Sequence, residues 1–169
     1  LYGKEPFNPF GGFGFNSDEF RELLEKENLF FMYKGHYVDL KISKLKQDFG
    51  NRFLVLDDSM YNDMYSLIKD VDILITDYSS VAFDFSYNKK PIVYYQYSDD
   101  YNFKDRYFDY ESMGFGEVTN DEDNLIDIIE EYLKNDCAMK EIYKKRVDNF
   151  YMFNDKNNCK RVYEAIIKL

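Results

Sequence analysis

Residues 72–95 constrain the fold of this chain more than any other stretch. An apolar strand at 73–75 runs into a polar turn at 76–80. A helical segment with an apolar face follows at 81–85, and a second apolar strand starts at Pro91. Two buried strands joined through a helix are typical of a βαβ unit, in which the strands are parallel.

The turn of this unit places two adjacent hydroxyls, Ser79 and Ser80, where the helix begins. Free backbone N–H groups and the helix dipole favour an anion at such a position, most often a phosphate. Serine is also a preferred N-cap residue, so in a simpler interpretation one of the two only caps the helix. Two hydroxyls exceed what capping requires, and the turn therefore predicts a phosphate-ligand domain.

Similar alternation along the rest of the chain predicts the fold class. Apolar strands are expected at 29–33, 53–56 and 117–119. Helices are expected from Asn16 or Ser17, at 39–47, from Ser59, from Asn120 or Asp121, and over 139–167 with a break near 153–155. The stretch 98–116 is expected to be irregular. The pattern predicts an α/β fold, a Rossmann-like parallel sheet covered by helices on both faces.

Composition narrows the function. At 169 residues the chain fits one domain. A net charge of −10 disfavours nucleic-acid binding, which needs a basic surface. No apolar run approaches the ~20 residues of a membrane span. Cys137 and Cys159 lack CxxC spacing, so no metal site is indicated and a reduced, cytoplasmic setting is expected. The chain opens on Leu1, so we expect a fragment of a longer protein.

The motifs of common nucleotide enzymes are missing. The sequence has neither GxxxxGK[ST] nor a strand-anchored GxGxxG, which argues against P-loop and ordinary nicotinamide proteins. No cofactor is expected. Ligands of parallel sheets bind beyond the carboxyl ends of the strands, so the segments to examine are 34–36, 57–59, 76–80 and the residues from Gln96 onward.

Three further side chains are candidates, each with a simpler alternative. His36, the single histidine, can donate to a phosphate oxygen or shuttle a proton, or it is an exposed loop residue. Lys34 can supply positive charge to a diphosphate, or it is a solvated lysine at the end of a strand. Asp84 lies on the same side of its helix as Ser80 and can accept hydrogen bonds from a sugar or glycerol hydroxyl, or it faces solvent.

Several motifs occur together in one known family. They are the stretch 73–85, the pair Lys90-Pro91, the strand end Lys34-Gly35-His36 and the aromatic-acidic run 106–111. Together they resemble the CDP-glycerol glycerophosphotransferase family, the teichoic-acid primases and polymerases. The resemblance covers most of the chain, and the Thr-Asp-Tyr-Ser-Ser-x-x-x-Asp core is its most specific part.

The resemblance implies an architecture and a set of site residues. Residues 1–169 are expected to form a single nucleotide-donor-binding domain, the C-terminal lobe of a two-lobed GT-B fold, with the N-terminal acceptor lobe absent. The residues implied to contact CDP-glycerol are Lys34, Gly35, His36, Ser79, Ser80 and Asp84, with Arg106 as an additional candidate. His36 is the implied catalytic residue.

The implied reaction is transfer of glycerol phosphate from CDP-glycerol to a teichoic-acid-type or other cell-surface polymer, with release of CMP. CDP-ribitol is an alternative donor. The acceptor, a polymer or lipid-linked molecule, is expected to bind through the missing lobe, so the fragment alone is expected to be inactive. The full-length protein is expected at the inner face of the bacterial membrane. Two alternative hypotheses for the function are a nucleotide-sugar-binding lobe of a GT-B glycosyltransferase and a non-catalytic flavodoxin-like interaction domain.

Overall fold

The computed structural model describes residues 17–34, 50–56, 64–96 and 107–169. Within these ranges, the helices are all too short or too polar to cross a membrane. The expected helix at 39–47 and the expected helix start at Ser59 lie outside the described residues.

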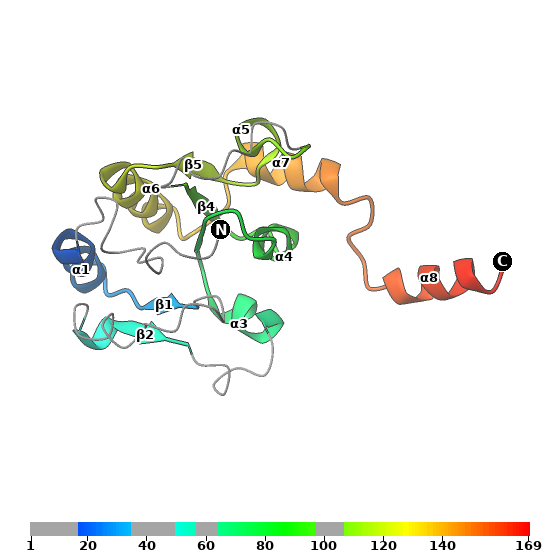
Figure 1. Cartoon of the computed structure of the whole chain (residues 1–169), viewed down its shortest axis with the longest axis horizontal. Coiled ribbons are helices and arrows are strands. Elements are labelled where there is room, and N and C mark those ends of the chain that lie inside the picture. The colour runs from blue at the N-terminus through cyan, green and yellow to red at the C-terminus, as the bar shows by residue number, and fades with distance from the viewer. Residues whose placement is uncertain (1–16, 35–49, 57–63, 97–106) are drawn as a thin grey trace, which may run out of the picture.

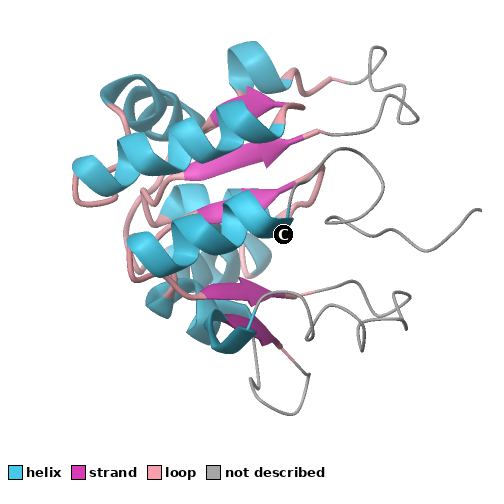
Figure 2. Ribbon diagram, turned by 90° about the vertical axis from the view of Figure 1, so that its left-hand side faces the viewer, coloured by secondary structure: helices cyan, strands magenta, loops and turns pink. Residues whose placement is uncertain are grey.

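All the strand pairs of the described ranges are parallel, as the sequence predicts. β1 pairs with β2, and β4 pairs with both β3 and β5, so the strands form two hydrogen-bonded groups. Figures 1 and 2 show the two groups in one layer, with all arrows pointing the same way and helices on both sides. The strands are β1 (Phe31–Tyr33), β2 (Phe53–Val55), β3 (Leu74–Thr76), β4 (Ile92–Tyr95) and β5 (Glu117–Thr119).

Within the described ranges, the helices follow the predicted order with two additions, the 3-10 turn η2 (Gly50–Arg52) and α5 (Tyr110–Met113). α5 lies inside the stretch that the sequence analysis left irregular, so that expectation was wrong there. The C-terminal helical region breaks between α7 and α8, a few residues wider than predicted. The helices are α1 (Ser17–Lys26), the 3-10 turn η2 (Gly50–Arg52), α3 (Met64–Asp70), α4 (Val81–Tyr87), α5 (Tyr110–Met113), α6 (Glu122–Lys134), α7 (Glu141–Phe150) and α8 (Asn158–Ile166).

β4 lies at the centre of the fold and divides its apolar residues between two cores. Val93 and Tyr95 face a core that α1 and α6 complete. Ile92 and Tyr94 face the opposite core, which is shared with α3, α4 and α7. This alternation is the period of two expected of a strand, and burial on both faces explains the unbroken apolar run from Pro91 to Tyr95.

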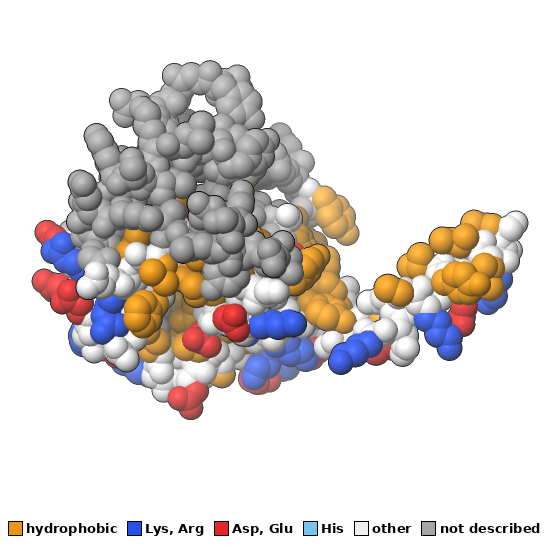
Figure 3. All heavy atoms as spheres, turned by 90° about the horizontal axis from the view of Figure 1, so that it is seen from below, with side chains coloured by type: hydrophobic (Ala, Val, Ile, Leu, Met, Phe, Trp, Pro, Cys, Tyr) orange, Lys and Arg blue, Asp and Glu red, His pale blue; other side chains and the backbone are white. Residues whose placement is uncertain are grey.

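α8 extends away from the rest of the molecule (Figure 1). Its hydrophobic side chains gather along one side and its charged side chains along the other (Figure 3). At the preceding turn, Arg161 donates hydrogen bonds to both carboxylate oxygens of Asp155, at 2.7 and 3.1 Å. This pair lowers the pKa of Asp155 well below its usual range and fixes the turn before α8.

Candidate functional site

The strand order reverses in the middle of the layer. The layer runs β2, β1, β3, β4, β5 (Figures 1 and 2), so the chain moves outward from β1 in one direction and then returns to continue in the other. The reversal lies between β1 and β3. Such a point leaves a crevice beyond the carboxyl ends of the two strands, which is where open α/β sheets bind ligands.

The Ser-Ser turn lies at the carboxyl end of β3, directly before α4. The backbone N–H of Val81 donates to Ser79 Oγ at 3.4 Å, so Ser79 supplies the side-chain cap of the helix. Ser80, the N-cap residue by position, has helical backbone angles and makes no side-chain cap hydrogen bond. Both serines are exposed. The Ser79 hydroxyl therefore caps α4, whereas the Ser80 hydroxyl does not cap it.

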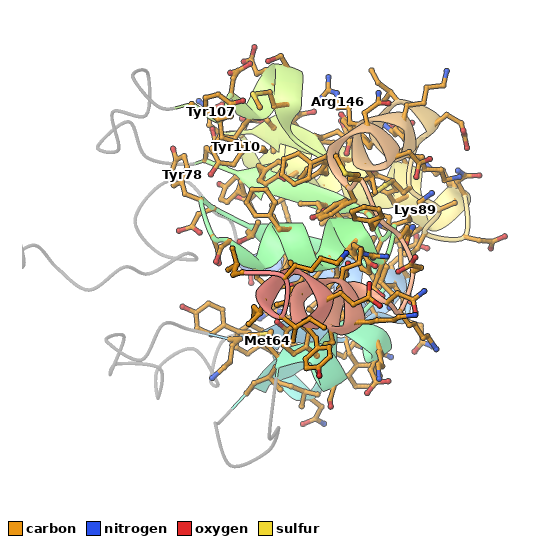
Figure 4. All side chains as sticks on the ribbon, turned by 90° about the vertical axis from the view of Figure 1, so that its right-hand side faces the viewer. Met64, Tyr78, Lys89, Tyr107, Tyr110 and Arg146 are labelled. Carbon is orange, nitrogen blue, oxygen red and sulfur yellow. The ribbon has the colours of Figure 1, made fainter. Side chains whose placement is uncertain are left out.

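Tyr110, from α5, supports the same turn from the side. Its hydroxyl donates to the backbone carbonyl of Tyr78 at 3.5 Å, and the two rings meet edge to face. Tyr110 also packs edge to face on Tyr94 of β4, with ring centroids 4.9 Å apart. Figure 4 shows Tyr78 and Tyr110 together at the end where the strands finish, opposite the end that carries Lys89.

The short helix α5 is itself held by a strong cap. Asp109 accepts hydrogen bonds from the Ser112 hydroxyl and from the Ser112 backbone N–H. These two bonds lower the pKa of the Asp109 carboxyl. The aromatic-acidic run therefore builds a support for the Ser-Ser turn. A Tyr-Phe-Asp-Tyr-Glu sequence does not reveal this role, because the support acts across a long separation in the chain.

Lys34 follows β1 directly and is exposed. β1 is the strand on the other side of the reversal, so Lys34 and the Ser-Ser turn follow the ends of the two strands between which the order reverses. Gly35, His36 and Arg106 lie outside the described residues, and their proposed contacts stay predictions.

Asp84 lies one helical turn after Ser80 and is half-buried. It lines a pocket of about 370 Å³ between α4 and the connection from α7 to α8. Tyr151, another residue that lines the pocket, donates a hydrogen bond to the Phe83 carbonyl at 2.7 Å. Burial raises the pKa of Tyr151. The full lining is Phe83, Asp84, Tyr87, Phe150, Tyr151, Met152, Phe153 and Asn158.

The lysine–proline pair that opens β4 has a structural role. Lys90 Nζ donates to the carbonyls of Lys69 and Val71, at 2.8 and 2.6 Å. These carbonyls lie at and just beyond the C-terminus of α3, where carbonyl groups lack helical partners and a cation is favourable. Lys90 thus joins α3 to the βαβ unit at the end opposite the Ser-Ser turn. Within the described ranges, no group of His, Cys, Asp and Glu side chains is arranged to hold a metal ion.

Comparison with known proteins places the chain in a family. The family model for CDP-Glycerol:Poly(glycerophosphate) glycerophosphotransferase matches residues 10–168. The chain belongs to this family. This agrees with the resemblance drawn from the motifs of residues 73–85 and 34–36.

Relatives with assigned roles act in teichoic acid synthesis. The chain is 50% identical over 110 residues to the minor teichoic acid biosynthesis protein GgaB of Bacillus subtilis, covering 64% of this chain and 12% of that protein. It is 30% identical over 154 residues to a teichoic acid poly(ribitol-phosphate) polymerase of Bacillus spizizenii, covering 88% of this chain and 23% of that protein. The chain spans only 12% to 39% of the length of the curated relatives it matches.

Solved structures share the fold. The structure of the wall teichoic acid polymerase TagF superposes with a TM-score of 0.63 at 25% identity, over 89% of this chain and 36% of that chain. The likeness confirms the predicted α/β fold with parallel strands flanked by helices.

Proposed function

We propose that this chain is the donor-binding domain of a CDP-glycerol glycerophosphotransferase. The whole protein then transfers glycerol phosphate from CDP-glycerol to a teichoic-acid-type or other cell-surface polymer and releases CMP. One observation supports this proposal above the others. The chain belongs to this family, and its Ser-Ser turn lies at the strand-order reversal, next to the end of the strand that Lys34 follows.

The geometry of the turn suits a diphosphate. Ser79 caps α4, and the exposed Ser80 hydroxyl can donate to a phosphate oxygen. Lys34 supplies positive charge, which matters because the chain carries a net charge of −10. Asp84, one turn further along α4, is suited to accept hydrogen bonds from ribose or glycerol hydroxyls. His36, which follows Lys34 by two residues, is proposed to lie beside the diphosphate.

The proposed chemistry is a direct phosphoryl transfer. An acceptor hydroxyl oxygen forms a bond to the glycerol-side phosphorus, while the bond from that phosphorus to the bridging oxygen breaks. The bridging oxygen keeps the electron pair and leaves on CMP, and the hydroxyl proton passes to a base. His36 stabilises the negative charge on the transferred group. Such reactions depend mainly on positioning and on charge stabilisation.

The rest of the assignment follows from this reaction. We propose that the chain forms one lobe of a GT-B enzyme, with the acceptor bound by a second lobe. The chemistry then takes place between the lobes, so this lobe alone binds donor without turning it over. Because the related polymerases act in teichoic acid synthesis, we place the whole protein in the cytoplasm at the inner face of the bacterial membrane.

CDP-ribitol is the second candidate donor. One of the related proteins is a poly(ribitol-phosphate) polymerase, at 30% identity. Family membership disfavours the two other readings, a nucleotide-sugar lobe and a non-catalytic interaction domain.

Isothermal titration calorimetry of the full-length protein tests the donor. CDP-glycerol is titrated in parallel with CDP-ribitol, CMP and a UDP-sugar. Binding of CDP-glycerol with at least tenfold preference over the UDP-sugar (about 1.4 kcal/mol) is the expected result. Binding of the UDP-sugar alone contradicts the proposal, and binding of none of the four favours an interaction domain.

A turnover assay tests the role of His36. We expect His36→Asn to reduce CMP release from CDP-glycerol by roughly 100-fold or more, with the dissociation constant for CDP-glycerol changed only a few fold. Asn149→Ala, on the exposed surface of α7, is the control. Unchanged turnover in His36→Asn would remove His36 from the mechanism.

A further inference from the structure

Gln96 carries an amide group whose role the fold does not explain. It follows β4 directly, and its backbone N–H still donates to the Thr119 carbonyl of β5 at 2.7 Å. Its side-chain Nε2 is enclosed, and within the described part of the chain no group accepts a hydrogen bond from it. Leaving an enclosed amide donor unpaired is unfavourable, so most such groups in proteins have a partner.

The direction of this side chain follows from the strand. Ile92 and Tyr94 face the core beneath α4, while Val93 and Tyr95 face the opposite core. Because the ladder continues through the Gln96 backbone, the alternation places the Gln96 side chain on the α4 face, one step beyond Tyr94.

That step brings Gln96 to the level of the Ser-Ser turn. Thr76, the last residue of β3, is in register with Tyr94, so residues just past Tyr94 lie beside the turn that leads to Ser79 and Ser80. Tyr110 spans this region, because it packs on Tyr94 and donates to the Tyr78 carbonyl. Gln96 and the turn therefore share the carboxyl edge of neighbouring strands, on the same face of the sheet.

We infer that Gln96 is a further donor-binding residue, whose amide N–H donates a hydrogen bond to an oxygen of the CDP-alditol held at the Ser-Ser turn. The inference rests on the proposed function and adds to it a contact from the residue that follows β4. The ligand oxygen, from a phosphate or an alditol hydroxyl, supplies the acceptor that the described residues lack.

The test combines binding and stability in the full-length protein. Gln96→Leu keeps the approximate volume of the side chain and removes the amide, and Gln96→Glu replaces the N–H donor with a carboxylate that repels phosphate. Asn149→Leu, at an exposed site on α7, is the matched control. The dissociation constant for CDP-glycerol is measured by calorimetry, and the melting temperature is measured without ligand.

We expect Gln96→Leu to weaken CDP-glycerol binding by roughly three- to tenfold, Gln96→Glu to weaken it further, and the control to leave it unchanged. The ligand-free melting temperature of Gln96→Leu stays the same or rises, because an unpaired enclosed donor has been removed.

Two outcomes overturn the inference. Unchanged affinity in Gln96→Leu shows that the amide does not contact the donor. Weaker affinity together with a lower ligand-free melting temperature assigns Gln96 to packing. Failure of the wild-type protein to bind CDP-glycerol is a different result, because it overturns the proposed function itself.

Discussion

Ser79 Oγ accepts a hydrogen bond from the Val81 backbone N–H at 3.4 Å, and this bond is the side-chain cap of α4. The neighbouring Ser80 makes no such bond. Of the two adjacent serines, Ser79 therefore uses its hydroxyl in the helix, whereas the Ser80 hydroxyl makes no cap bond and is the one that we propose binds the ligand.

This difference predicts that alanine substitution of Ser79 affects stability, whereas alanine substitution of Ser80 affects donor binding. Ser79→Ala is expected to lower the free energy of unfolding by about 0.5–1 kcal/mol, because the Val81 N–H loses its acceptor. Ser80→Ala is expected to change stability by less than about 0.5 kcal/mol, since no cap is lost. It is expected to weaken CDP-glycerol binding roughly tenfold, because a hydrogen bond to a charged phosphate is removed. Urea unfolding and calorimetry check the pair, and a stability loss confined to Ser80→Ala would reverse these roles.

Substitution of Lys90 is expected to lower the stability of the fold without changing donor binding. Lys90→Met removes the two hydrogen bonds to the carbonyls of Lys69 and Val71 and is expected to lower the free energy of unfolding by about 1–3 kcal/mol. Lys89→Met is the control, because the Lys89 ammonium forms a surface ion pair with Asp148, worth about 0–1 kcal/mol. Donor affinity is expected to be unchanged in both variants. Weaker donor binding by Lys90→Met at unchanged stability would place this lysine in the site.

Gly116 predicts a severe packing defect. A Cβ added there would lie 1.8 Å from the Ile92 carbonyl oxygen, which belongs to the backbone of the neighbouring strand β4. The strands must separate to admit it, so Gly116→Ala is expected to lower the free energy of unfolding by more than about 3 kcal/mol. Urea unfolding is compared with that of Asn120→Ala, an exposed site just after β5. A Gly116→Ala protein as stable as this control would show that the two strands are not so close.

Tyr94 predicts a loss of stability in alkaline solution. Burial raises the pKa of Tyr94 to about 12, with the Phe115 N–H that donates to its hydroxyl acting in the opposite direction. The fold favours the neutral phenol, so this contribution is fully present below pH about 10, the pKa of an unfolded tyrosine, and is lost as pH rises toward about 12.

Urea unfolding at pH 8 and pH 11 measures this effect. Between these two values the wild-type protein is expected to lose about 1.4 kcal/mol more than Tyr94→Phe, which cannot ionise. The comparison with Tyr94→Phe separates Tyr94 from the other groups that titrate in this range. An equal loss in both proteins would show that the Tyr94 phenol ionises as easily in the folded state as in the unfolded state.

Much of the site could be predicted because its signals are local. The strand at 73–75, the polar turn and the helix from Val81 follow one another in the chain, and each is set by near neighbours. Ser79, Ser80 and Asp84 were proposed as site residues from this pattern, and their contacts with a ligand stay predictions. The places of Lys34 and the turn at the carboxyl ends of two strands also followed, because parallel strands end at one edge of the sheet.

What the sequence alone determined is the alternation of strands with the longer helices, the parallel α/β class and the Ser-Ser turn, since periodicity and capping act over a few residues. It did not predict the short helices η2 and α5. Only the tertiary structure decided that Tyr110 supports the turn and that Lys90 binds the end of α3. The physical reason is that these contacts join residues far apart in the chain. Their distances are set by how the two cores pack against β4, and no local pattern of residues records that packing.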